Sequence, residues 1–191
     1  MSYAIIALEL GSLVALLVTA FLGYALGGEL AALVPGTADP GGLVAAALGA
    51  TFRRHFALAL IGTLSALFAE SMIFFYFIGT GVAIKKAVAL YDLDRRYLQQ
   101  VRAFKARTSG VAFLALLALI AAFVLGGGTA TRAVPRLGHE IAAWVAIALH
   151  GWSAWASTRA IRENVGLLAE LDQVVRAKAE RGEVAIERTV V

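Results

Sequence analysis

One glutamate stands in the middle of a long apolar run. Glu70 is surrounded in the sequence by Phe68, Met72 and Phe75, and no Lys or Arg lies near it. An ionisable side chain at membrane depth is costly enough that such residues are typically functional. We therefore expect Glu70 to serve as a metal ligand or a proton acceptor. Together with Thr63, on the same broad face of a helix, it is also the predicted lining of a proton pathway.

The three histidines extend this pattern. His139 and His150 are eleven residues apart, which at about 100° per residue places both on one helix face, about 16 Å apart along the axis. His55 and Glu70 are fifteen residues apart, about 60° out of alignment and so on one broad face. If the two helices run parallel, these two faces can meet.

This arrangement predicts a cofactor. Neutral imidazole is a good ligand for haem iron and for divalent metals. A haem between two transmembrane helices needs one histidine from each at matching depth, and His55 and His139 satisfy this, with Phe52, Phe56 and Trp144 nearby as flanking rings. We expect cofactor binding by His55, His139 and His150, and metal binding by Glu70 and His150. The cofactor is haem b or a transition metal, and the function redox or electron transfer.

Other interpretations stay open. His55 follows Arg53 and Arg54 and is equally suited to contact lipid headgroups, while His150 can serve as a single hydrogen-bonding group between helices. For Glu9, two turns from the start of its apolar run, a structural role is the favoured interpretation. Two other functions compete with cofactor binding: a non-catalytic subunit or scaffold of a larger membrane complex, and a proton or ion pathway through Glu70.

Composition places the chain in a membrane. Hydrophobic residues make up 60% of the chain and charged residues 16%, against roughly 45–50% and about 25% in soluble domains. The net charge is +4, but the basic residues are not interleaved with aromatics, so we expect no nucleic-acid binding. The absence of Cys excludes disulfides and thiolate metal sites. We find neither a phosphate loop around Gly79 and Gly81 nor a zinc-type His-Glu motif, which disfavours a membrane hydrolase.

Four apolar runs predict an all-α, four-helix transmembrane bundle that forms a single integral membrane domain over residues 1–191. The spans are expected at about 4–26, 56–84, 111–125 and 141–160. Seven basic residues lie between 85 and 107 and six after 158, against two in each of the other connections. By the positive-inside rule, both termini are cytoplasmic. We expect a multi-pass protein of the bacterial inner membrane.

Two polar segments, 85–107 and 161–180, have the spacing of amphipathic helices. Apolar residues recur at steps of three and four in both: Leu90, Leu93, Tyr97, Val101 and Phe104 in the first, and Ile161, Val165, Leu168, Leu171 and Val175 in the second. We expect cytoplasmic extensions of spans two and four. They either pack on each other as a stalk or dock onto a membrane protein partner, a second copy or a membrane surface.

Two segments carry a resemblance to known sequences. Residues 74–81, Phe-Phe-Tyr-Phe-Ile-Gly-Thr-Gly, are followed by Lys85 and Lys86, and residues 161–168 open the tail. Both resemble segments of uncharacterised bacterial four-span integral membrane proteins. The resemblance covers a minor part of the chain. It implies the number of spans and no activity.

Overall fold

The protein is all-α. The computed structural model describes residues 2–32, 43–130 and 133–184, and over these ranges it contains four helices and no strand. They are α1 (Ser2–Ala32), α2 (Leu43–Leu90), α3 (Arg96–Ala130) and α4 (Arg136–Glu180). The predicted fold class is therefore confirmed.

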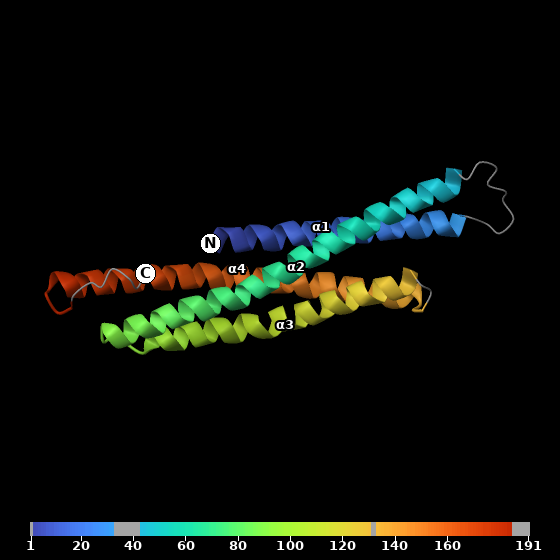
Figure 1. Cartoon of the computed structure of the whole chain (residues 1–191). Helices are drawn as coiled ribbons and strands as arrows, with labels where there is room; N and C mark the ends of the chain where they lie inside the picture. The colour runs from blue at the N-terminus through green and yellow to red at the C-terminus, as the bar shows by residue number, and fades with distance from the viewer. Residues whose placement is uncertain (1, 33–42, 131–132, 185–191) are drawn as a thin grey trace.

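The four helices form a long rod (Figure 1). α1 packs chiefly against α2, and α3 against α4. α2 crosses obliquely, so that its first half lies beside α1 and its second half beside α3. The N-terminus lies near the middle of the rod, whereas the α2–α3 turn and the end of α4 lie together at one end. The rod therefore has a part with four helices and a part with three.

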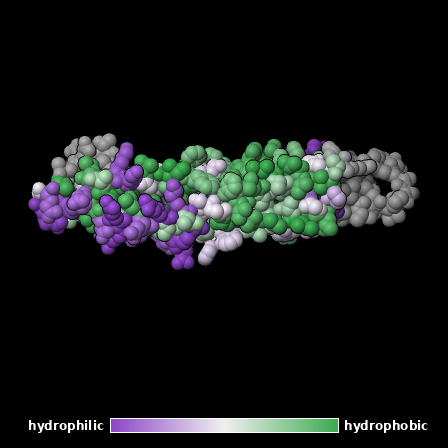
Figure 2. Space-filling model, turned by 90° about the horizontal axis from the view of Figure 1, so that it is seen from below, coloured by the Kyte–Doolittle hydropathy of each residue, from purple (hydrophilic) through white to green (hydrophobic). Residues whose placement is uncertain are grey.

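Three of the helices are long and apolar enough to cross a membrane, over Ser2–Ala25, Gly49–Leu90 and Arg96–Thr129. A band of apolar side chains covers the part of the rod built from four helices, and hydrophilic side chains gather at the three-helix end (Figure 2). Such a surface suits a lipid bilayer. α4 is less apolar than these three helices, because polar residues such as His150, Ser153 and Ser157 occupy its buried face.

The three-helix end has its own core. Tyr97, Val101 and Phe104 of α3 are buried together with Ile161 and Leu171 of α4. The two amphipathic stripes therefore pack within one chain, as the stalk interpretation expects, although Leu90 and Val165 are exposed. Ion pairs join Arg107 to Glu163 and Arg96 to Glu170 across the surface of this end. The Arg107 guanidinium, which donates to Glu163, lowers the pKa of that carboxyl.

The prediction of one amphipathic helix over 85–107 is wrong. α2 ends at Leu90, and α3 begins at Arg96. Between them Asp92 adopts a φ of 46°, the left-handed conformation that ends helices. The Asp94 carboxylate accepts a hydrogen bond of 2.8 Å from the Arg96 N–H, and Lys178 of α4 donates to the Tyr91 and Asp92 carbonyls. These groups satisfy the backbone at the two helix ends and fix the turn.

Candidate metal centre

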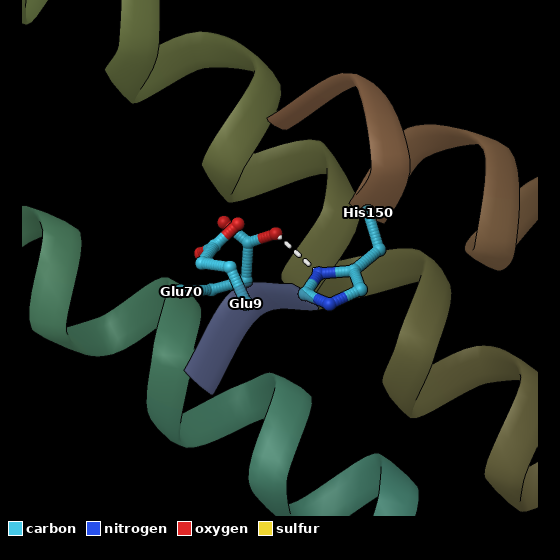
Figure 3. A group of neighbouring side chains, drawn as sticks. All are labelled: Glu9, Glu70 and His150. Atoms are coloured by element: carbon cyan, nitrogen blue, oxygen red, sulfur yellow. Dashed lines mark hydrogen bonds and ion pairs between the residues drawn. The ribbon is translucent and has the colours of Figure 1, made fainter. Parts of the chain in front are cut away.

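Three ionisable side chains meet inside the four-helix part of the rod. Glu9 comes from α1, Glu70 from α2 and His150 from α4, and their exposed fractions are 1%, 0% and 0%. Figure 3 shows the two carboxyl groups side by side, facing the imidazole. One potential ligand atom from each residue lies within 4.8 Å of the other two. The helices α1, α2 and α4 therefore meet at this point.

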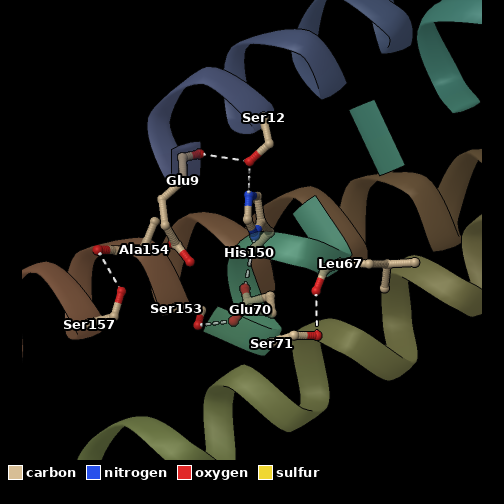
Figure 4. Close-up of polar contacts among 9 residues, drawn as sticks. All are labelled: Glu9, Ser12, Leu67, Glu70, Ser71, His150, Ser153, Ala154 and Ser157. Atoms are coloured by element: carbon tan, nitrogen blue, oxygen red, sulfur yellow. Dashed lines mark hydrogen bonds and ion pairs between the residues drawn. The ribbon is translucent and has the colours of Figure 1, made fainter. Parts of the chain in front are cut away.

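Two serines complete a chain of hydrogen bonds (Figure 4). His150 Nδ1 lies 2.8 Å from Glu70 Oε1, and the Ser153 hydroxyl donates to Glu70 Oε2 at 2.7 Å. On the other side of the ring, His150 Nε2 lies 2.9 Å from Ser12 Oγ. The Ser12 hydroxyl in turn donates to the Glu9 carbonyl oxygen at 3.0 Å. Ser12 and Ser153 are both buried.

One arrangement of protons fits this chain. The Ser12 hydroxyl can donate to the Glu9 carbonyl, which only accepts. In that arrangement Ser12 Oγ accepts from His150, and Nε2 carries a proton. One further proton in the contact between Nδ1 and Glu70 Oε1, either on the ring or on Glu70, would make the Glu70–His150 pair neutral overall.

Glu9 is the member of the cluster without a partner. In the described part of the chain, neither of its carboxyl oxygens has a hydrogen-bond partner, although both are buried. A buried carboxylate with no partner is very unfavourable in an apolar interior. Without a cation Glu9 is therefore a neutral carboxylic acid, and its unpaired oxygens face Glu70 and His150. Buried polar groups are nearly always paired, so Glu9 is an exception that needs an explanation.

The set of donors fits a divalent metal ion. Carboxylate oxygens and imidazole nitrogens both bind zinc, at about 2.0–2.2 Å. Ligand atoms at those distances lie roughly 3.3 Å apart in a tetrahedral site, and the three candidate ligand atoms here lie within 4.8 Å of one another. The Nε2–H bond to Ser12 would orient the ring from behind, as second-sphere partners of ligating histidines do.

Comparisons with known sequences and structures do not assign a function to this site. No family model, no curated protein and no solved structure matches the chain. The resemblance to four-span bacterial membrane proteins therefore stays an expectation. What the site does has to be argued from its own chemistry.

The structure brings together only part of the predicted site. Glu70 and His150 are in direct contact. Thr63 is buried on α2 about two turns away. In the described part of the chain Glu70 bonds instead to His150 and to Ser153 of α4. Glu9, for which a structural role was favoured, belongs to the cluster. It lies on one buried stripe of α1 with Ile5, Ser12, Leu16 and Thr19, and this spacing of three and four is visible in the sequence.

His55 and His139 lie elsewhere. Each contacts a backbone carbonyl of the preceding helix, at Thr19 and Ala122 respectively, and His139 is about 16 Å from His150 along α4. The expectation that Phe52, Phe56 and Trp144 flank a macrocycle stays a prediction. Their exposed fractions are 42%, 50% and 39%; Phe52 stacks on Phe56, and Trp144 contacts Tyr24.

Proposed function

We propose that this protein is an integral membrane protein that binds one divalent transition-metal ion between α1, α2 and α4. Glu9, Glu70 and His150 are the ligands. The observation that carries this proposal is the unpartnered, fully buried carboxyl group of Glu9, which faces a buried Glu–His pair. A scaffold subunit would have no use for such a group, because an apolar residue there would give a more stable core.

The ligand set favours zinc, iron(II) or manganese(II). Imidazole suits zinc and iron, and carboxylate oxygens suit manganese, whereas the softer copper(I) prefers the sulfur ligands that are absent here. Three protein ligands leave at least one position open for water or a substrate, as in catalytic metal sites. Iron or manganese at this position would support the redox role that the sequence suggests.

Binding would exchange one divalent ion for two protons. Without metal the cluster holds one proton on Glu9 and one shared by Glu70 and His150, and its total charge is zero. With metal, two carboxylates and a neutral imidazole balance the charge of +2. Ligands must lose their protons to bind, and a neutral total charge avoids the high cost of a net charge in the membrane interior. The site is therefore suited to a reversible exchange of metal for protons.

The proposal includes an arrangement of the helices in the membrane. We place α4 across the bilayer at 141–160 as a fourth span, because His150 and Ser153 bond to Glu70 of α2, a helix that is long and apolar enough to cross a membrane. The three-helix end, with most of the basic residues, lies in the cytoplasm together with both termini. A bacterial inner membrane and one membrane-embedded domain agree with this arrangement.

A Glu9→Met variant tests the proposal by separating metal binding from folding. We expect the purified wild type in detergent to bind about one Zn²⁺, Fe²⁺ or Mn²⁺ per chain in equilibrium dialysis followed by elemental analysis. The variant should lose this binding. Its metal-free form should be more stable, by about 1–3 kcal/mol in the free energy of unfolding, because an unsatisfied buried polar group is removed. Methionine is chosen because its side chain is flexible and similar in length to that of glutamate, so it can fill the same space.

Ser157→Ala is the matched control, since Ser157 is buried on the same face of α4 but donates to its own helix at Ala154. It should bind metal like the wild type. A Glu9→Met variant that binds metal with unchanged affinity would refute the assignment of Glu9. A wild type that binds none of the three metals would refute the function.

A proton or ion pathway through Glu70 is the second candidate. The chain of hydrogen bonds from Ser12 through His150 and Glu70 to Ser153 supports it, since such a chain can relay protons. In vesicles, a pathway predicts proton flux in metal-free protein that Glu70→Gln abolishes. A pure metal site predicts no such flux.

A further inference from the structure

The charges of the three-helix end are balanced on one flank of α3 but not on the other. Arg96 and Arg107 each pair with a glutamate of α4. Arg102 and Lys105 of α3 are exposed, as is Lys85 of α2. In the part of the chain that the structure describes, none of these three cations has a carboxylate partner. They therefore form an uncompensated positive charge.

Arg102 and Lys105 point away from the ion pairs with α4. Each follows a buried residue, Val101 or Phe104, by one position, whereas the two paired arginines each precede a buried residue by one position. One position is about 100° of helix rotation, so the two pairs of cations lie on opposite flanks of the buried stripe of α3. Because one flank faces α4, the other faces α2.

α2 and α3 touch at Gly81. A Cβ atom at this glycine would lie 3.3 Å from Val101 Cγ1, so the two helices are in close contact there. The helices run in opposite directions (Figure 1), and a step of one residue past the contact therefore turns both to the same side of the pair. This step leads to Val82 on α2 and Arg102 on α3, which are both exposed.

The α2 part of this side is apolar. Phe75, Ile78 and Val82 recur at steps of three and four, with exposed fractions of 68%, 49% and 51%. The same rotation from Gly81 places all three on the side of the exposed α3 cations. Lys85 follows Val82 by three residues and ends the stripe. We call these residues, together with Arg102 and Lys105, the α2–α3 surface.

We propose that the α2–α3 surface binds one anionic phospholipid. Its phosphate contacts the three unpaired cations, and one acyl chain lies along the apolar stripe of α2. Arginine suits phosphate because its N–H groups can bind two oxygens at once, and basic surfaces between membrane helices bind anionic headgroups. The unbalanced charge favours a headgroup with a net negative charge over a zwitterionic one. The apolar stripe favours a lipid over a soluble phosphate compound.

Native mass spectrometry of the detergent-purified protein with added lipid tests this proposal. We expect one phosphatidylglycerol molecule per chain, bound about 10-fold or more tightly than phosphatidylcholine with the same acyl chains. The combined variant Lys85→Gln, Arg102→Gln and Lys105→Gln should lose this preference, because each cation near a lipid headgroup contributes about fivefold. All three side chains are exposed, so the variant should keep the fold, which circular dichroism and elution volume check.

A variant with the same loss of charge on α4 is the matched control: Arg159→Gln, Arg162→Gln and Arg176→Gln. These side chains are also exposed, but they lie on another helix. The control should keep the preference for phosphatidylglycerol. Equal losses in the two variants would show attraction to the total charge only, and the proposal of a site on α2 and α3 would be wrong.

Inorganic phosphate, added at constant ionic strength, separates a lipid site from a site for soluble phosphate compounds. Because phosphate cannot use the apolar stripe, we expect it to leave the lipid bound. Full displacement of the lipid would overturn the assignment of a phospholipid. The result does not depend on the inner metal site, since Glu9→Met should bind phosphatidylglycerol like the wild type.

Discussion

Replacing Glu70 by glutamine is expected to reduce metal affinity by about 100-fold or more, beyond the roughly 10- to 100-fold typical of second-sphere changes. The amide keeps the shape of the carboxyl group. It can accept from Ser153 and donate to His150 Nδ1, so the hydrogen bonds of the metal-free protein survive. The charge that neutralises the metal is lost. Competition with a zinc-binding dye, on protein in detergent, measures the change.

Ser71→Ala is the matched control for this experiment. Ser71 is the next residue of α2, but its hydroxyl donates to the Leu67 carbonyl of its own helix at 2.8 Å. Its removal should leave metal affinity within about twofold of the wild type, since it does not touch the cluster. Equal affinities for the wild type and Glu70→Gln would show that the bound ion lies elsewhere.

Replacing His150 by alanine is expected to lower the free energy of unfolding by about 3–5 kcal/mol, the range found for breaking a buried ion pair and for removing a large buried ring. The ring bonds to both Glu70 and Ser12. Without it, Glu70 keeps only the Ser153 hydrogen bond, and a cavity forms where the three helices meet. Metal binding should also be lost. Denaturant-induced unfolding in detergent, followed by circular dichroism, measures the destabilisation.

A double-mutant cycle separates the two causes of this loss. The main cause can be the buried Glu70 carboxyl group that has lost its partner. In that case Glu70→Leu, introduced into the His150→Ala variant, should restore part of the stability, because no unpaired polar group remains. If the cavity dominates, the two changes should simply add. A His150→Ala protein as stable as the wild type would contradict the pairing of Glu70 and His150.

The sequence predicts much of this fold because apolar runs and their interruptions are local features. The helical class, the place of Glu70 and His150 within apolar runs and the two packed stripes of the three-helix end follow from runs of about 20 apolar residues and from steps of three and four. The turn at Asp92 was missed, because the apolar pattern continues through it from Leu90 to Tyr97. Its conformation depends on Lys178, far along the chain.

The site was harder to predict. Distances counted along ideal helices place Glu70 deeper than His150, and the oblique crossing of α2 brings the two together. Glu9 lies near the start of its helix, where a carboxylate can often reach water, so its burial depends on α4 packing over it. A helix has the same aromatic residues whether they face lipid or a cofactor, and Phe52, Phe56 and Trp144 are exposed.

The number of protons released per metal ion tests the central claim most directly. Calorimetric titration of the purified protein with Zn²⁺, in two buffers that differ in ionisation enthalpy, gives this number. We expect about two protons per ion, one from Glu9 and one from the Glu70–His150 pair. Binding without proton release would mean that the cluster is already ionised or that the ion binds elsewhere, and it would contradict the neutral exchange proposed here.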